Sequence, residues 1–219
     1  MHLCLIIPAC DAGPPLCGTV SEALKTGYPV LVVDDGSRVC SSVFLAGLPV
    51  TVLRHPVHLG KGRALQSGFQ WAADRGYSGV ITLDADARDP AGSIRALAAA
   101  ASSAEPQIFL GAAPVSDDEA DLPGRCGRFA AWCLNKKTGA SVAQAYPRIR
   151  YYPGAVLAGL ALESKGPRLE TEVLVKAVRS GHRIGSVPLS PPRAERLPKR
   201  PVPSARDALT VCLALLRYG

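Results

Sequence analysis

The chain has 219 residues, of which 47% are hydrophobic and 20% charged, a composition that suits one globular domain and excludes a disordered or fibrous protein. Its longest apolar run, Ala208–Leu216, is much shorter than the about 20 residues of a membrane-spanning helix. The first basic residue is Lys25 and Asp11 interrupts the apolar opening, which is unlike a secretion signal. We therefore expect a cytoplasmic protein, soluble or held at the inner face of a membrane.

The formal net charge of +7 is unevenly distributed: residues 1–90 sum to −1, residues 91–180 to +3 and residues 181–219 to +5. This gradient indicates an anionic partner near the C-terminal half, either a phosphate-bearing substrate or an acidic membrane surface. A solvated basic tail is an equal explanation for residues 191–206. No nucleic-acid partner is expected, because aromatic residues are only 5% of the chain and no binding motif accompanies the charge. The seven cysteines include no Cys-x-x-Cys pair, which favours buried free thiols.

Short apolar runs in the first half predict strands buried on both faces of a parallel sheet. They are Leu3–Ile7, Val30–Val33, Val50–Leu53 and Gly79–Leu83. A helix is predicted over Gly62–Arg75, where apolar residues recur on one face, and another begins at Pro90 and continues through Ile94–Ala101. This alternation predicts a single α/β domain with a doubly wound, mostly parallel sheet.

The pattern is weaker after residue 111. In chain order we expect an acidic loop, a helix, an irregular stretch rich in Pro and Tyr, a second helix and a last strand; the four bounded elements are Asp117–Asp121, Gly124–Lys137, Leu169–Ser180 and Arg183–Val187. Six prolines exclude regular structure from residues 188–203, and Ser204 is a candidate N-cap for a closing helix that reaches Arg217. These features predict a domain of residues 1–187 and a basic segment 188–219 packed on it or on a membrane surface.

Asp84 and Asp86 directly follow the predicted strand Gly79–Leu83. In open α/β sheets, ligands bind at the carboxyl ends of strands. Two adjacent carboxylates repel each other unless a cation lies between them, and a hard divalent ion shared with nucleotide phosphates meets that need. The same pair in an ordinary loop would have no such role.

A second acidic pair, Asp34-Asp35-Gly36-Ser37, follows the strand Val30–Val33. These residue types are also common in plain turns. At the edge of one parallel sheet, however, the two acidic pairs would converge. One pair could then bind the base or ribose of a nucleotide, and the other could hold metal and diphosphate.

A glycine-rich run, His58–Ala64, opens the helix predicted after the third strand. Glycines let a backbone approach a ligand closely, and a helix N-terminus with Lys61 and Arg63 attracts phosphate. The spacing is neither that of a Walker loop nor that of a dinucleotide fingerprint. Alone, the run indicates an anion site.

In their order and spacing, these motifs resemble the family 2 glycosyltransferases, particularly the dolichyl-phosphate mannosyltransferase-like branch. The matching segments cover nearly the whole chain: Ile6–Pro8, Val33–Ser37, Gly60–Leu65, Leu83–Asp86, Gly124–Phe129, Arg150–Pro153, Arg168–Leu174, Gly181–Ile184 and Val187–Pro188. The resemblance implies a GT-A fold. It also implies transfer of a hexose from a nucleotide-diphosphate sugar to a lipid-linked phosphate, such as polyprenyl phosphate, or to a hydroxyl acceptor, assisted by Mg²⁺ or Mn²⁺.

Carried over residue by residue, the resemblance gives roles to the motifs. Pro8 would begin the nucleotide-binding loop, and Asp34 and Asp35 would contact the base. Lys61 would lie near the nucleotide. Asp86 would hold the metal with help from Asp84, and the ion would neutralise charge on the departing diphosphate.

The implied acceptor oxygen is already anionic, so the acceptor needs cations more than a strong general base. Arg125 and Arg128, spaced for one helix face, and Arg150 are the candidates, because guanidinium groups bind phosphate bidentately. Arg125 and Arg128 could instead be solvent-facing helix residues. Glu170 and Glu172 either orient a positive group in the site or pair with Arg168.

Several family positions are altered. The usual Pro-x-Tyr-Asn-Glu opening is Pro8–Ala12 here, without the aromatic ring or the glutamate. Arg88 replaces a Gln that commonly follows the metal-site aspartates, and Gln144–Arg150 replaces Asp-x-Gln-x-Gly-x-Arg. Either the enzyme uses an unusual donor or acceptor, with Arg88 supplying part of the metal's charge, or it binds a nucleotide sugar without turnover.

Two other expectations concern class and location. A sugar-phosphate nucleotidyltransferase is a third alternative, although Ala9–Gly13 lacks the Gly-rich loop of that class. Since no C-terminal transmembrane helix is present, any membrane contact would be peripheral, through Ala208–Leu216 with Arg206 and Arg217 at its ends.

Overall fold

The computed structural model describes residues 1–87, 90–103, 107–112, 129, 131–136, 139, 142, 147–166 and 168–190. The expected acidic loop Asp117–Asp121 and the closing helix from Ser204 lie outside these residues. The helix expected over Gly124–Lys137 is described in part, and residues 131–136 are helical. Within the described segments, no helix combines the length and apolarity needed to cross a bilayer.

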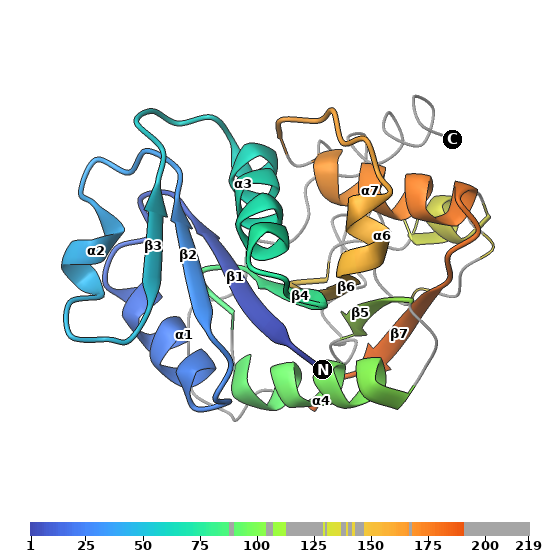
Figure 1. The fold of residues 1–219 in the computed structure, drawn as a ribbon, viewed down its shortest axis with the longest axis horizontal. Helices are drawn as coiled ribbons and strands as arrows, with labels where there is room; N and C mark the ends of the chain where they lie inside the picture. Colours follow the sequence, from blue (N-terminus) through green and yellow to red (C-terminus); the bar gives the residue numbers. More distant parts are fainter. Residues whose placement is uncertain are drawn as a thin grey trace.

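A seven-stranded sheet organises the fold, with strand order β3-β2-β1-β4-β6-β5-β7 (Figure 1). The strands are β1 Leu3–Ala9, β2 Val30–Asp34, β3 Thr51–Arg54, β4 Gly79–Leu83, β5 Ile108–Ala112, β6 Ile149–Pro153 and β7 Ile184–Pro188. The five strands expected from sequence are confirmed to within two residues. All described strands run parallel except β6, which is antiparallel to both β4 and β5.

Strand β6 corrects one expectation, since it lies in the stretch that we expected to be irregular. Its five residues are all buried, and its tyrosines have the aromatic side chains that strands favour. The strand is held by ladders on both sides, with Tyr151 opposite Ile81 of β4 and Phe109 of β5. Pairing with two neighbours outweighs the turn propensity of Pro147 before the strand and of Pro153 at its end.

Helices cover both faces of the sheet, which confirms the doubly wound α/β class. They are α1 Pro15–Leu24, α2 Ser41–Phe44, α3 Lys61–Asp74, α4 Pro90–Ser103, α6 Gly154–Ala158 and α7 Arg168–Arg179. Helices α1 and α4 contact each other and bury residues in one core cluster. Helices α3, α6 and α7 contribute to the opposite cluster (Figure 1).

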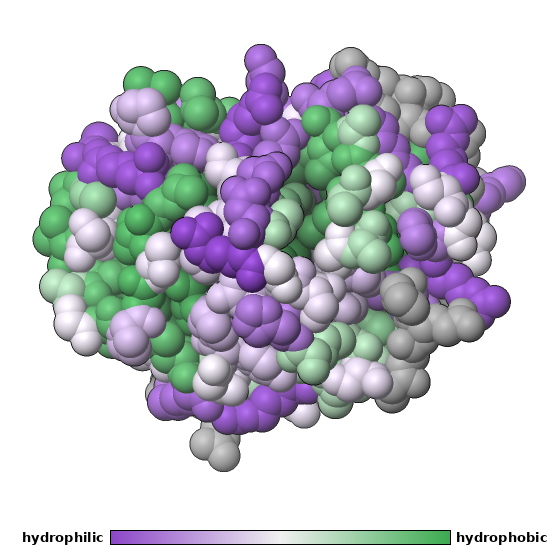
Figure 2. Space-filling view, in the orientation of Figure 1, coloured by the Kyte–Doolittle hydropathy of each residue, from purple (hydrophilic) through white to green (hydrophobic). Residues whose placement is uncertain are grey.

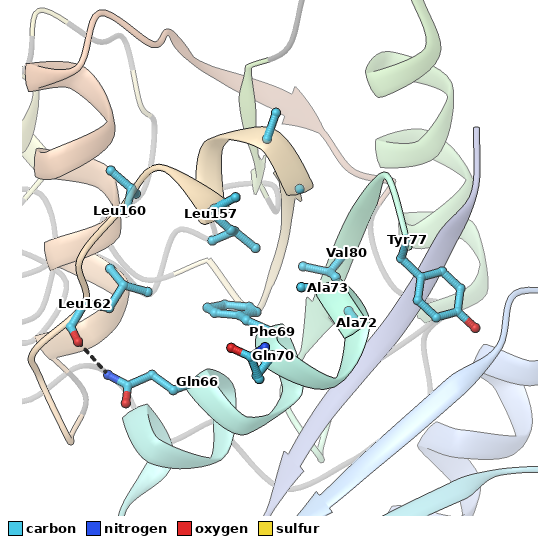
Figure 3. Close-up of a pocket in the computed structure, with 13 residues that line it drawn as sticks. Gln66, Phe69, Gln70, Ala72, Ala73, Tyr77, Val80, Leu157, Leu160 and Leu162 are labelled. Carbon is cyan, nitrogen blue, oxygen red and sulfur yellow. Dashed lines mark hydrogen bonds between the residues drawn. The ribbon is translucent and has the colours of Figure 1, made fainter. Parts of the chain in front are cut away.

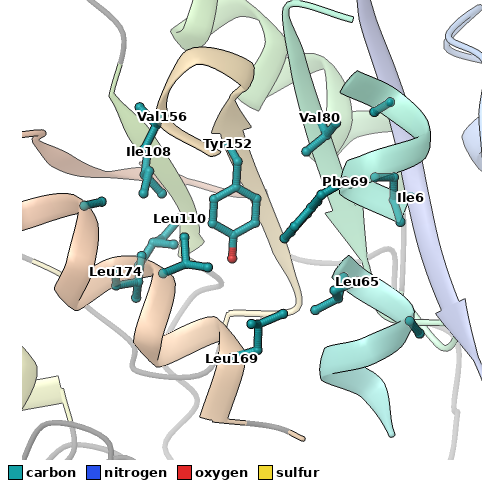
Figure 4. Close-up of a cluster of buried hydrophobic side chains, with 14 of the residues drawn as sticks. Ile6, Leu65, Phe69, Val80, Ile108, Leu110, Tyr152, Val156, Leu169 and Leu174 are labelled. Atoms are coloured by element: carbon teal, nitrogen blue, oxygen red, sulfur yellow. The ribbon is translucent and has the colours of Figure 1, made fainter. Parts of the chain in front are cut away.

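The core on the α3 side is a continuous apolar cluster (Figure 4). Phe69 packs its ring edge against Tyr152 with centroids 5.6 Å apart. Leu65 of α3 and Leu169 of α7 are 1% and 0% exposed. This packing fixes the N-terminal ends of α3 and α7 against the same part of the sheet.

The reversed direction of β6 positions the site. Because β6 is antiparallel to β4, its first residues lie beside the last residues of β4, with Ile149 opposite Leu83 and Arg150 opposite Thr82. The carboxyl edge of the sheet therefore combines the end of β4 with the beginning of β6. Strands β2 and β4 lie on opposite sides of β1, so the strand order reverses at β1. In open α/β sheets, the crevice at such a reversal is where ligands bind.

Truncating the α3 core should destabilise the fold without changing its surface. Leu65→Ala should lower the free energy of unfolding by about 2–5 kcal/mol, because it leaves a cavity in a packed core. Leu59→Ala is the matched control, since Leu59 is 45% exposed, and it should stay within about 0.5 kcal/mol. Urea denaturation monitored by circular dichroism measures both, and equal losses would contradict the assigned packing.

Candidate functional site

Asp34 ends β2 with its side chain turned inward. It is 0% exposed, and its two oxygens accept hydrogen bonds from the backbone N–H of Ser37 at 2.9 Å and of Ser41 at 2.6 Å. Burial opposes ionisation, but the bonds from Ser41 and Ser37 outweigh it and hold the pKa of Asp34 below its ordinary value. In this structure both oxygens of Asp34 are used to shape the loop after β2, and its contact with a base stays a prediction.

Asp35 is also buried, at 2% exposure, and it organises the loop that precedes α3. Its carboxylate accepts the backbone N–H of Leu59 at 3.0 Å and of Gly60 at 2.7 Å. Nδ1 of His55 lies 2.7 Å from one oxygen, and Nε2 of the same ring lies 2.9 Å from Ser67 Oγ on α3. Burial raises the pKa of Asp35, yet these bonds outweigh it and lower the pKa overall.

Two glycines permit close backbone approaches around this loop. A Cβ on Gly36, whose φ is +72°, would lie 2.4 Å from the backbone nitrogen of His58. A Cβ on Gly62 would lie 2.6 Å from the carbonyl oxygen of Gly166. The glycine-rich run is therefore pressed between the β2 loop and the segment before α7.

Lys61 begins α3 and joins the acidic residues of the edge. Its Nζ lies 2.7 Å from Asp84 Oδ1 and 3.0 Å from Glu170 Oε1. Burial disfavours the charged ammonium, but the Coulomb attraction of Glu170 and Asp84 outweighs it and raises the pKa of Lys61. Gly60 donates its N–H to Asp35, and the next residue, Lys61, pairs with Asp84. Two adjacent residues therefore link the acidic pair after β2 to the acidic pair after β4. The expected convergence of these pairs is what the structure shows.

Arg150 is only 4% exposed, and its guanidinium pairs with Glu170. Its Nε finds no hydrogen-bond partner among the described residues, nor does Thr82 Oγ1 opposite it on β4. Glu170 thus fixes Arg150 and Lys61 together, so it orients positive groups in the site. Arg150 was expected to bind an acceptor phosphate directly. A side chain that is buried and already paired with Glu170 is not well placed for that contact.

Glu172 stabilises the chain around α7, whereas Glu170 pairs with the cations of the sheet edge. It is fully buried and pairs with Lys176 at 2.7 Å. Its carboxylate also accepts the backbone N–H of Glu163 and of Ser164, each at 2.8 Å. Glu172 therefore ties the segment before α7 to that helix.

Asp86 lies at the open rim, with its side chain 62% exposed. Arg148 Nη1 lies 2.5 Å from Asp86 Oδ1 and also donates to the Asp86 carbonyl oxygen at 3.2 Å. The carbonyl of Arg148 in turn accepts the N–H of Asp84 at 3.0 Å. Both members of the Asp-x-Asp motif are thus paired with a basic side chain.

The donor set suits a hard divalent cation that is shared with a ligand. Carboxylate oxygens of Asp84 and Asp86 are ligands that Mg²⁺ and Mn²⁺ accept. Among the described residues, no group of three or more His, Cys, Asp or Glu side chains could hold a metal by itself. The remaining ligands would come from phosphate oxygens, the usual arrangement for Mg²⁺ at nucleotide sites.

The other expected residues are placed as follows. Pro8 is buried within β1, opposite Val33 of β2, so the loop after β1 begins two residues later, at Cys10. Arg88, Arg125 and Arg128 lie outside the described residues. Arg148 and His55 were not among the residues singled out from sequence. His55 could have been found, since it follows β3 just as the acidic pairs follow β2 and β4, whereas Arg148 depends on the unexpected strand β6.

A separate groove of about 550 Å³ lies between α3 and α6. Figure 3 shows its apolar floor, with Phe69 and Leu157 facing each other and Gln66 bonded to the Leu162 carbonyl at the rim. None of the acidic or basic residues of the edge lines this groove. In the space-filling view, polar residues cover α3, while apolar surface gathers over α2 and β3 and over α6 (Figure 2).

The family model described as glycosyl transferase family 2 matches residues 4–156, more than half of the chain. The chain belongs to glycosyl transferase family 2. An undecaprenyl-phosphate mannosyltransferase from Micrococcus luteus is 28% identical over 214 residues, covering 87% of this chain and 83% of that protein. The recognised resemblance is thereby confirmed.

Solved structures resemble this glycosyl transferase over almost its whole length. Glucosyl-3-phosphoglycerate synthase from Mycobacterium tuberculosis, in complex with Mn²⁺, UDP and phosphoglyceric acid, matches with a TM-score of 0.75 and 19% identity, covering 99% of this chain and 78% of that one. Its complex with Mn²⁺, UDP and glucosyl-3-phosphoglycerate matches with a TM-score of 0.74 and 17% identity, covering 99% and 79%. This similarity confirms the GT-A fold.

The inward carboxylate of Asp34 gives a pH-dependent prediction. Its folded pKa lies below the ordinary 3.8, so its contribution to stability is present above about pH 4 and is lost as pH falls through the folded value. Asp34→Asn should lower the free energy of unfolding by about 1–3 kcal/mol at neutral pH, because an amide cannot accept both backbone bonds. The difference in the free energy of unfolding between Asp34→Asn and the wild type should become smaller below about pH 4.

Urea unfolding at a series of pH values measures this gap. Asp74→Asn, at the exposed end of α3, is the matched control and should follow the wild-type curve. A gap that stays constant or widens in acid would contradict the assigned role of Asp34.

Proposed function

We propose that this glycosyl transferase moves a hexose from a nucleotide-diphosphate sugar to a lipid-linked phosphate of the polyprenyl type, with Mg²⁺ or Mn²⁺ at the Asp-x-Asp motif. The observation that carries the proposal is the convergence of Asp84, Asp86, Lys61 and Arg148 at one rim of the sheet. The name of the Micrococcus luteus relative supports a lipid-phosphate acceptor. The similar Mycobacterium tuberculosis structures, which are complexes with Mn²⁺ and UDP, support the donor and metal classes.

Asp84 and Asp86 would hold the divalent ion, which when bound supplies Lewis-acid stabilisation of charge on the departing diphosphate. Lys61 and Arg148 already lie against these carboxylates. When the carboxylates are neutralised by another cation, both side chains become free to donate hydrogen bonds to diphosphate oxygens. They then stabilise the negative charge that grows as the sugar–oxygen bond breaks.

Glu170 positions the cations in this scheme. It receives both Lys61 and Arg150, so Lys61 keeps one acidic partner when it leaves Asp84. Arg150 acts through Glu170 from its buried place and does not touch the acceptor. Acceptor binding then falls to other cations, of which Arg125 and Arg128 are the candidates that we propose.

Donor and acceptor assays test the proposed function. The purified chain, with UDP- or GDP-hexose and Mn²⁺, should glycosylate undecaprenyl phosphate in vesicles but not 3-phosphoglycerate. Asp86→Asn should reduce this transfer about a hundredfold or more, while Asp74→Asn should retain it. Failure to bind any donor, with or without Mn²⁺, would contradict the proposal.

A nucleotide-sugar-binding protein without turnover is the second candidate. The pairing of both motif aspartates with internal cations favours it, because such a site is already neutralised. Donor binding in the same assay, without transfer to any acceptor, would establish this candidate in place of the first.

The internal cations should compete with the metal. Lys61→Met removes the positive charge beside Asp84, so Mn²⁺ alone should bind several-fold more tightly, whereas the nucleotide sugar should bind more weakly. Electron paramagnetic resonance titration of free Mn²⁺ measures the first effect and calorimetry the second. Lys25→Met, on the exposed end of α1, is the control, and weaker Mn²⁺ binding by Lys61→Met would contradict the competition.

A further inference from the structure

Two large aromatic side chains and a lysine form an exposed surface near residue 132, which we call the aromatic patch: Phe129, Trp132 and Lys136. Phe129 is 52% and Trp132 55% exposed. Their rings stack with centroids 5.9 Å apart and planes 24° from parallel. Lys136 Nζ lies 5.2 Å from the Trp132 ring centroid, so the ammonium and both rings form one continuous surface.

The patch is held on a fixed base. Ala131 and Leu134, on the other face of the same helical segment, are 5% and 1% exposed and belong to the core cluster that includes α7. Asn135 bonds to the backbone of Val142 in both directions, accepting its N–H at 2.8 Å and donating to its carbonyl at 3.0 Å. The buried face cannot rotate outward, so Trp132 stays exposed unless something else covers it.

The sequence around the patch carries basic residues and no acidic ones. Within seven residues of Trp132 on either side are Arg125, Arg128, Lys136 and Lys137, and no acidic residue. The stretch without an acidic residue runs from Leu122 to Leu162. Tryptophan beside lysine and arginine is typical of protein surfaces that insert into the interface of a bilayer. The ring lies at the boundary between headgroups and acyl chains, and the cations contact lipid phosphates.

We propose that the aromatic patch docks this protein on an anionic lipid bilayer. The stacked rings supply apolar area, and Lys136 beside Trp132 supplies attraction to acidic headgroups. The patch is fixed to the core cluster that includes α7. The inference rests on the proposed function in one respect: a lipid-linked acceptor lies in a bilayer, so the enzyme would have to bind that bilayer to reach it.

Vesicle binding tests the patch separately from catalysis. The full chain is sedimented with phosphatidylcholine vesicles, with or without phosphatidylglycerol, that contain no polyprenyl phosphate and no donor. Trp132→Ser with Phe129→Ser should weaken binding to the anionic vesicles about tenfold or more. Lys136→Gln should weaken it about fivefold, and only when phosphatidylglycerol is present.

The matched control is Val43→Ser, since Val43 is an apolar residue of α2 that is 63% exposed, and it should bind as the wild type does. The chain has two tryptophans, so in a Trp71→Phe background the remaining emission comes from Trp132. That emission should shift to the blue on adding anionic vesicles.

Three outcomes would overturn the proposal: vesicle binding unchanged in the double variant, an equal loss in Val43→Ser, or no spectral shift. Analytical ultracentrifugation distinguishes the other occupant, a second copy of the chain. A dimer that the double variant converts to monomer, without vesicle binding by the wild type, would assign the patch to self-association. Because no sugar is present, failure here leaves the acceptor assay as an independent test of the proposed function.

Discussion

Repulsion between carboxylates at one edge of the sheet is the constraint on which the rest of the site depends. Strands β2 and β4 run parallel on either side of β1 and end at the same edge of the sheet. Asp34 and Asp35 stand at the end of β2, and Asp84 and Asp86 come directly after β4, so all four lie at that edge. The protein neutralises the pairs in two ways. The β2 pair is turned inward and satisfied mainly by backbone N–H groups, whereas the β4 pair is met by Lys61 and Arg148. The first solution fixes the loops after β2 and before α3, whereas the proposed function requires the second to be exchanged for metal and diphosphate.

The reversed strand β6 makes the second solution available. An additional parallel strand would bring its carboxyl end to this edge, and its first residues would lie on the opposite side of the molecule. Because β6 is antiparallel, Arg148 and Arg150 lie at its beginning, beside the end of β4. Glu170 from α7 then joins Arg150 to Lys61. One topological reversal therefore gives an acidic edge its basic partners.

The features that the sequence predicted well are those with a local signal. Strand β4 and helix α3 were predicted from short apolar runs and from helical periodicity, and the Asp-x-Asp motif was placed at the end of its strand. The inward turn of Asp34 could not be read in this way, because its partners are backbone N–H groups that any sequence provides. Arg150 was expected to bind the acceptor phosphate, and its burial could not be read from the sequence, because the partner that explains it, Glu170, comes twenty residues later. Strand β6 was missed because tyrosines between two prolines match a loop as well as a buried strand.

Charge balance explains why donor and metal should bind together. In the described site, Lys61, Arg148 and Arg150 carry three positive charges, and Asp84, Asp86 and Glu170 carry three negative ones. A divalent cation alone would leave this neutral cluster with an excess of positive charge, and a sugar-linked diphosphate alone would leave it with an excess of negative charge, each unfavourable in a partly buried site. The two together preserve neutrality, so each should increase the affinity for the other by the same factor. This coupling follows from the internal cations, because an Asp-x-Asp motif without Lys61 and Arg148 would already attract the metal alone.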